Sequence, residues 1–252
     1  MVWLHICHEE GIGRIHERSE NQKLISMWGA YIIGILIALV GTYVSSRLRS
    51  KFDEYSKIQL ANGMSGKEIA LKMLHDNGIY DVQVVSVQGK LTDHYNPVNK
   101  TVNLSPDVYE GRSVSAAAVA AHECGHAVQH QVAYSWLTMR SKLVPVVSFT
   151  SNIVQWVLLG GILLINRFPG LLLAGIIMLA AVTLFSLITL PVEYDASHRA
   201  LAWIRGKGIA RNNEYDAAQD ALKWAARTYV VSAVGSVATL LYYLMIYMGR
   251  RR

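Results

Sequence analysis

Four long apolar segments constrain the fold of this chain more than any other feature of its sequence. Their bounds are residues 27–45, 144–165, 171–190 and 229–248. A helix needs about 20 residues to cross the hydrocarbon core of a bilayer, and each segment has close to that length. The sequence therefore predicts four transmembrane helices. Residues 166–170 are long enough only for a tight turn, so the second and third helices should form a hairpin.

Composition agrees with a membrane protein and excludes a disordered or disulfide-stapled one. Hydrophobic residues make up 52% of the chain and charged residues 17%, and the two cysteines, Cys7 and Cys124, are too few for a disulfide framework. The formal net charge of +6 would suit nucleic acid or an anionic membrane surface. Because four segments have membrane length, the lipid bilayer is the expected partner and nucleic acid is not.

The distribution of positive charge predicts the orientation in the membrane. Four crossings place residues 46–143 and 191–228 on one side, and these loops hold 17 of the 24 Lys and Arg residues. Cytoplasmic loops carry an excess of Lys and Arg, so we predict a multi-pass protein of the cell membrane with its large loops in the cytoplasm. The basic tail at 249–252 opposes this orientation. Residues 1–26 show no signal peptide and are expected to be a disordered N-terminal extension.

The loop at residues 46–143 has the character of a soluble domain. Ser65 and Glu68 form a capping-box pattern at the start of an amphipathic helix. After it we expect two strands, a helical turn and a long Ala-rich helix, at residues 82–87, 101–104, 106–109 and 113–134. The order predicts a small α+β domain at the membrane surface, in a protein that is otherwise mainly α.

The Ala-rich helix contains an H-E-x-x-H motif, His122-Glu123-Cys124-Gly125-His126. Residues four apart lie on the same face of a helix, so both imidazoles can reach one Zn²⁺. Glu123 then lies beside the metal, where it can act as the general base of a hydrolase. The other interpretation is a structural histidine pair. An ionisable cluster in so apolar a helix is costly unless it serves a site, which favours zinc.

A hydrolytic zinc site needs a third protein ligand, and Glu193 is the candidate. It lies in segment 191–228, which two crossings return to the same side of the membrane as the motif. Pro191 is expected to disrupt the third membrane helix and turn Glu193 back toward the motif. The other interpretation of Glu193 is a charged anchor at the membrane interface.

Four further residues are candidates for supporting roles. Asp195 could accept a ring N–H from a ligand histidine, and His198 with Arg199 could stabilise a tetrahedral oxyanion. His94, in a predicted turn between strands, could orient the substrate. A structural or surface role explains each of them equally well.

Beyond these motifs, the chain from about Met27 to Met248 resembles the YugP-type membrane zinc metallopeptidases, a family of bacterial neutral zinc metallopeptidases. The resemblance rests on particular stretches, at residues 91–97, 104–106, 109–113, 120–127 and 190–197. In its arrangement the chain is also similar to the HtpX-like membrane peptidases, in which two membrane helices separate H-E-x-x-H from a glutamate ligand.

The resemblance implies a zincin-like catalytic region at 46–143 and one Zn²⁺ ion. It implies His122, His126 and Glu193 as zinc ligands and Glu123 as the catalytic base, a gluzincin-like set. Cys124 departs from the pattern, because such motifs more often have an apolar residue there. A cysteine packs as a small hydrophobe, so no thiol role is expected, although it could sensitise the site to oxidation.

Two functions of different classes follow from these features. The first is a membrane-embedded zinc endopeptidase whose peptide or protein substrate, including membrane proteins, pairs with an edge strand such as 101–104. The second is a zinc-containing membrane scaffold or binding protein with little or no proteolytic activity. A charged base at Glu123 favours the enzyme, because a scaffold gains nothing from it.

Overall fold

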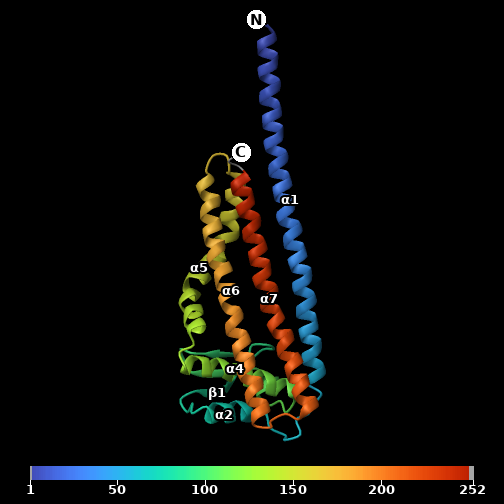
Figure 1. Ribbon diagram of the computed structural model, residues 1–252, viewed down its shortest axis with the longest axis vertical. Coiled ribbons are helices and arrows are strands. Elements are labelled where there is room, and N and C mark those ends of the chain that lie inside the picture. The colour runs from blue at the N-terminus through green and yellow to red at the C-terminus, as the bar shows by residue number, and fades with distance from the viewer. Residues whose placement is uncertain (1, 250–252) are drawn as a thin grey trace. The chain divides into compact units, whose positions relative to one another are not determined.

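A computed structural model describes residues 2–249 of the chain, which is mainly helical with one small sheet (Figure 1). The elements in chain order are α1 (Val2–Tyr55), α2 (Gly66–Asp76), β1 (Gln83–Ser86), β2 (His94–Asn96), β3 (Thr101–Leu104), α3 (Pro106–Tyr109), α4 (Val114–Gln131), α5 (Ser135–Leu163), α6 (Pro169–Gly206) and α7 (Asn212–Gly249).

Four of these helices are long and apolar enough to span a membrane, as the sequence predicts. The candidate spans are Tyr31–Tyr55, Ser135–Leu163, Pro169–Gly206 and Asn212–Gly249. The helices are longer than the predicted segments because the polar residues that flank each apolar segment are also helical. Helix α1 also runs through residues 2–26, where the sequence predicts a disordered extension.

The chain divides into two compact units. The helical unit comprises Met1–Val40, Ser148–Thr183 and Val234–Arg252, and the site unit comprises Gly41–Val147 and Leu184–Ala233. Helices α1, α5, α6 and α7 each contribute to both.

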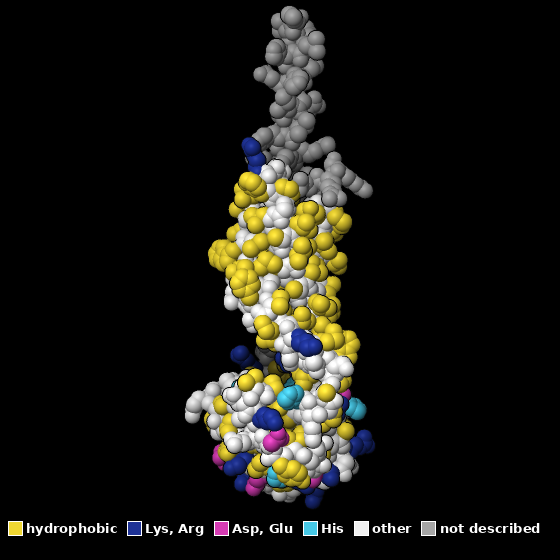
Figure 2. Space-filling view, turned by 90° about the vertical axis from the view of Figure 1, so that its left-hand side faces the viewer, with side chains coloured by type: hydrophobic (Ala, Val, Ile, Leu, Met, Phe, Trp, Pro, Cys, Tyr) yellow, Lys and Arg dark blue, Asp and Glu magenta, His cyan; other side chains and the backbone are white. Residues whose placement is uncertain are grey.

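The helical unit exposes apolar side chains, as a lipid-facing bundle does. Phe149 and Trp156 are 70% and 72% exposed, and Figure 2 shows many hydrophobic side chains at the surface between the grey residues and the charged lower end. Inside the unit, Leu158 of α5 packs with Leu172 of α6. A Cβ atom at Gly161 would lie 2.6 Å from the Leu172 Cα atom, so these two helices approach closely, as the predicted hairpin requires.

The site unit contains a three-stranded sheet in the order β1-β3-β2. β1 and β3 are parallel, and β2 is antiparallel to β3. The predicted strands at 82–87 and 101–104 are confirmed as β1 and β3. The choice of Thr101–Leu104 as an edge strand is wrong, because β3 is paired on both sides. The sequence analysis missed β2, whose three residues are too few for an alternating pattern and lie where a turn was expected.

Helices α2 and α4 pack against each other in the site unit. The predicted capping box at Ser65 and Glu68 is present, with both reciprocal hydrogen bonds formed. α4 begins at the side-chain cap of Ser113. The fully buried Met73 and Leu74 belong to the same core as the alanines of α4. This core gives the motif helix a fixed position, because a close-packed interior tolerates little displacement.

Helix α6 does not break at Pro191, contrary to the sequence prediction. It continues from Pro169 to Gly206 with Pro191 inside it. A proline within a helix removes its own N–H bond and crowds the preceding turn, but helices of membrane length tolerate this where neighbouring groups satisfy the freed carbonyl. Glu193 therefore reaches the motif from a continuous helix rather than from a chain reversal.

Candidate metal centre

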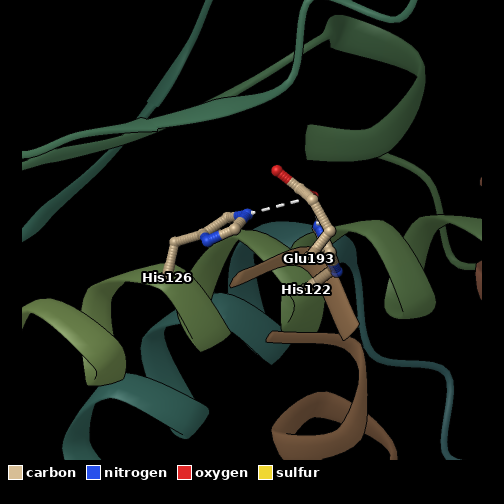
Figure 3. A group of neighbouring side chains, drawn as sticks. All are labelled: His122, His126 and Glu193. Carbon is tan, nitrogen blue, oxygen red and sulfur yellow. Dashed lines mark hydrogen bonds and ion pairs between the residues drawn. The ribbon is translucent and has the colours of Figure 1, made fainter. Parts of the chain in front are cut away.

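His122 and His126 of α4 and Glu193 of α6 meet in the site unit (Figure 3). The Glu193 Oε2 atom lies 3.3 Å from His122 Nε2 and 3.6 Å from His126 Nε2. One ligand atom from each residue falls within 4.8 Å of the other two. Glu193 is only 3% exposed. This buried group could hold a metal ion.

The two helices come this close because a glycine lies at their crossing. A Cβ atom at Gly125 would be only 2.6 Å from the Ala196 carbonyl oxygen, so the side-chain hydrogen of glycine leaves room for the backbone of α6. On α6, Val192, Ala196 and Ala200 are fully buried at four-residue spacing. Gly125 and the small or buried residues that face it therefore allow close approach of the two backbones at the motif.

Hydrogen bonds to the Nδ1 atoms orient both histidines. Ser197 Oγ lies 3.1 Å from His122 Nδ1, and Gln129 Oε1 lies 3.0 Å from His126 Nδ1. An imidazole that donates from Nδ1 keeps a lone pair at Nε2 for a metal. Both Nε2 atoms face the Glu193 carboxylate.

The orientation of the Gln129 amide follows from its other partners. Its Nε2 atom donates to the Val192 carbonyl oxygen and to Asp195 Oδ2, both at 2.8 Å. Both partners are pure acceptors, so the amide oxygen has to face His126. Gln129 is fully buried, and its orientation sets the donor role of His126 Nδ1.

Glu123, which follows His122 on α4, is buried with 8% exposure. Its carboxylate makes no hydrogen bond or ion pair with another side chain in the part of the chain that the structure describes.

Burial and charge affect two further groups on α4. Burial disfavours the imidazolium form of His126, but the hydrogen bond and the negative charge of Glu193 outweigh it, so the pKa of His126 is raised above its ordinary value. A metal would have to displace this proton. Burial raises the pKa of Cys124 well above its usual range, and the charge of Glu123 adds to the effect. The thiol, which donates to the Ala70 carbonyl oxygen at 3.5 Å, is poorly suited to oxidation through a thiolate.

The other candidate residues do not join this group. Asp195 is one step removed from the metal ligands, since it contacts Gln129 rather than a histidine. Arg199 forms an ion pair with Asp195 at 2.6 Å. His198 is exposed and borders a separate cavity with Asp195 and Arg199. His94 lies on strand β2, where its Nδ1 atom is 2.7 Å from the Thr92 carbonyl oxygen.

Two side chains in the site carry a signal that the sequence analysis missed. Gln129 lies three residues after His126, and Ser197 lies four residues after Glu193. Both spacings put a polar group on the same helix face as a candidate ligand. Polar residues three or four positions after a candidate ligand are therefore the signal that identifies Gln129 and Ser197.

Comparison with known proteins agrees with this site and with the apolar helices. A family model described as "Putative neutral zinc metallopeptidase" matches residues 30–248. The chain is 44% identical over 221 residues to a protein of Bacillus subtilis (strain 168) named "Putative membrane protease YugP", with 87% of this chain and 97% of that protein covered. No solved structure matches the chain. The length of the family match and the identity to this relative show that the chain belongs to the neutral zinc metallopeptidase family that the model describes.

Proposed function

We propose that this chain is a membrane-embedded zinc endopeptidase in which His122, His126 and Glu193 hold one Zn²⁺ and Glu123 is the general base. The observation that carries the proposal is the buried set of two imidazole nitrogens and one carboxylate oxygen around a common point. Three protein ligands that leave a fourth position open are typical of catalytic zinc.

The donor set fits zinc by its chemistry. Among the residues that the structure describes, the ring nitrogens that face the common point contact the Glu193 carboxylate, and the opposite ring nitrogens bond to Ser197 and Gln129. Glu193 would supply one negative charge to the ion. The bound ion would contribute Lewis-acid chemistry, by polarising the scissile carbonyl and acidifying water.

Glu123 would move the proton during peptide hydrolysis. Its carboxylate takes one proton from the attacking water as the water oxygen bonds to the carbonyl carbon. It delivers this proton to the amide nitrogen as the C–N bond breaks, which yields a carboxylic acid and an amine and restores the carboxylate. Its lack of protein partners leaves both oxygens available for this exchange.

The substrate would pair as an added strand with β2 (His94–Asn96), which lies at an edge of the sheet. The strand Thr101–Leu104 lies in the centre of the sheet and is not available for this pairing. β2 is tied to the motif helix, because Tyr95 Oη lies 2.9 Å from His130 Nδ1. His130 lies one helical turn after His126. An extended peptide on this edge would gain main-chain hydrogen bonds and run past the site.

The site would face the cytoplasm, from the imbalance of Lys and Arg between the loops. A cysteine introduced at the exposed Lys100, in a chain without Cys7, should stay unlabelled by a membrane-impermeant maleimide in intact cells and become labelled after lysis. Labelling in intact cells would reverse the orientation.

Cleavage of unfolded membrane-protein fragments tests the activity. The zinc-loaded full-length chain should cleave them, and a zinc-loaded Glu123→Gln variant should not. If the fully loaded parent leaves all fragments intact, the chain is a zinc-containing scaffold instead. Equal cleavage by the variant would show that another protein in the preparation is responsible.

A further inference from the structure

Helix α5 carries a row of uncharged polar side chains inside its candidate membrane span. The row consists of Ser148, Ser151, Asn152 and Gln155, and all four are exposed. Residues at the spacing i, i+3, i+4 and i+7 share one side of a helix. These four residues, called the α5 stripe below, therefore form one continuous polar surface within the helical unit.

No other helix of the helical unit exposes side chains of this kind, as far as the structure describes them. The described side chains of α1 in this unit include no Ser, Thr, Asn or Gln. In α6 and α7 such residues are buried or half-buried, and they are Thr183, Ser236 and Thr239. The exposed polar groups are thus gathered on one side of a single helix.

The α5 stripe lies at membrane depth, and its polar groups have no partner within the chain. Gln155 is at the middle of the apolar segment 144–165, and Ser148 lies about 10 Å from it along the helix axis. None of the four side chains hydrogen-bonds to another residue that the structure describes. Because polar groups are costly in hydrocarbon, such side chains typically hydrogen-bond to a neighbouring membrane helix. A second helix against the stripe would supply the missing partners.

We propose that the α5 stripe is the contact between two copies of this chain, which pair side by side about a two-fold axis along the membrane normal. Copies with the same orientation hold each stripe residue at the same depth. Hydroxyl and amide side chains each contain a donor and an acceptor, so every level of the stripe can satisfy its own counterpart. A different partner would need polar residues at matching depths, which a second copy has by necessity.

Charge and shape around the stripe agree with a pair of copies. Residues 143–163 of α5 contain no charged residue, so the two helices meet without like-charge repulsion. Ser148 and Ser151 are small, and small residues let membrane helices approach closely. Phe149 and Trp156, which are exposed on the same helix, add apolar surface for packing beside the contact.

Fluorescence transfer between separately labelled full-length chains in lipid vesicles measures the pairing. The parent should follow a monomer–dimer equilibrium as the protein-to-lipid ratio is lowered. The double variant Asn152→Leu, Gln155→Leu removes both amides and should raise the dissociation constant by about 5- to 30-fold. Ser232→Ala, which removes an exposed hydroxyl from α7, is the control and should stay within about twofold. A double variant that pairs as tightly as the parent would overturn the proposal.

Disulfide trapping shows where the copies touch. In a chain with Cys7→Ser, either Ser148→Cys or Ser151→Cys should give covalent dimers under a mild oxidant, because a disulfide needs Cα atoms within about 7 Å. Ile177→Cys, on α6 and 63% exposed in the parent, is the control and should stay monomeric. Cys124 is buried and is common to all variants. Equal trapping at position 177 would mean random collision and would contradict the assigned contact.

The pairing does not depend on the peptidase function, and its test requires no turnover. Monomers at every protein-to-lipid ratio would overturn the proposal and would leave the stripe to a different membrane protein. A dimer that is weakened by the double variant and trapped only through the stripe would establish it.

Discussion

Helix α6 carries two groups of polar side chains on opposite faces, and they differ in burial and in partners. Glu193 and Ser197 are buried and contact the motif histidines. Asp195, His198 and Arg199 border a cavity of about 420 Å³ on the other face, between α6 and the C-terminal end of α2, where Met73 and the capping residue Asn77 line it.

The difference between the faces follows from helical phase. Residues four apart on a helix share a face, whereas residues two or five apart do not. Nearness to Glu193 in sequence therefore predicts little about nearness to the candidate metal centre. The two faces are coupled at one point, because Gln129 bonds to both His126 and Asp195. The cavity face can thus support the site without touching it.

The largest expected loss of zinc and activity comes from changing the two α4 histidines that face the buried side of α6. His122→Ala or His126→Ala should lose zinc and activity together, because removal of one of three ligands breaks the coordination set. His198→Ala should change both by less than about twofold, as expected for an exposed side chain. Metal analysis of purified variants measures this. Full zinc occupancy in His126→Ala would mean that the motif is not the site.

The two glutamates of the site should respond differently to the same chemical change. Glu193→Gln should weaken zinc binding and lower turnover, because a neutral amide replaces a charged ligand. Glu123→Gln should keep zinc and lose about 10²- to 10⁴-fold in turnover, as removal of a general base does. Zinc titration alongside peptide hydrolysis separates the two. The opposite result, with zinc lost from Glu123→Gln alone, would exchange their roles.

A smaller effect is expected where the two helices cross. Gly125→Ala adds a Cβ atom 2.6 Å from the Ala196 carbonyl oxygen, so α4 and α6 must move apart. A displacement of this size should lower kcat/KM by about 10²-fold and destabilise the fold. Gly206→Ala is the control, since no atom lies within 4 Å of the added Cβ. Thermal unfolding and kinetics of both variants provide the measurement; equal values would mean that the crossing is loose.

The smallest effect tests the coupling of the two faces. Gln129→Leu keeps the side-chain volume but removes the acceptor of His126 Nδ1, and it should weaken zinc binding by about 10- to 100-fold. Asp195→Asn should have a weaker effect in the same direction, because it acts on His126 only through Gln129. Zinc competition with a chromophoric chelator gives both values. If Asp195→Asn had the larger effect, Asp195 would have to act directly on the metal site.

Local patterns predicted much of the fold and of the candidate site. The capping box at Ser65, the strand at Thr101–Leu104 and the motif helix after Ser113 all depend on neighbours in sequence, and the structure has each of them. Glu193 was identified as a candidate because an even number of membrane crossings separates it from the motif. The structure places it beside both histidines.

Features that depend on tertiary packing could not be predicted in this way. Whether Pro191 breaks α6 depends on how its neighbours satisfy the freed backbone groups. The central position of β3 depends on the short strand β2, which has no pattern of its own. Arg140 contacts Glu193 only because α5 and α6 pack side by side, and no spacing in the sequence encodes that distance.

The order of the ligands along the chain has a consequence for biosynthesis. His122 and His126 are synthesised before α5, whereas Glu193 follows only after α5 and most of α6. A nascent chain therefore exposes two imidazoles without the carboxylate, too few to form the hydrolytic centre. The group of three side chains is complete only once the intervening apolar hairpin has been synthesised. If the chain is the zinc peptidase proposed above, the order of its ligands would therefore delay hydrolytic activity until the second and third membrane-length helices have been made.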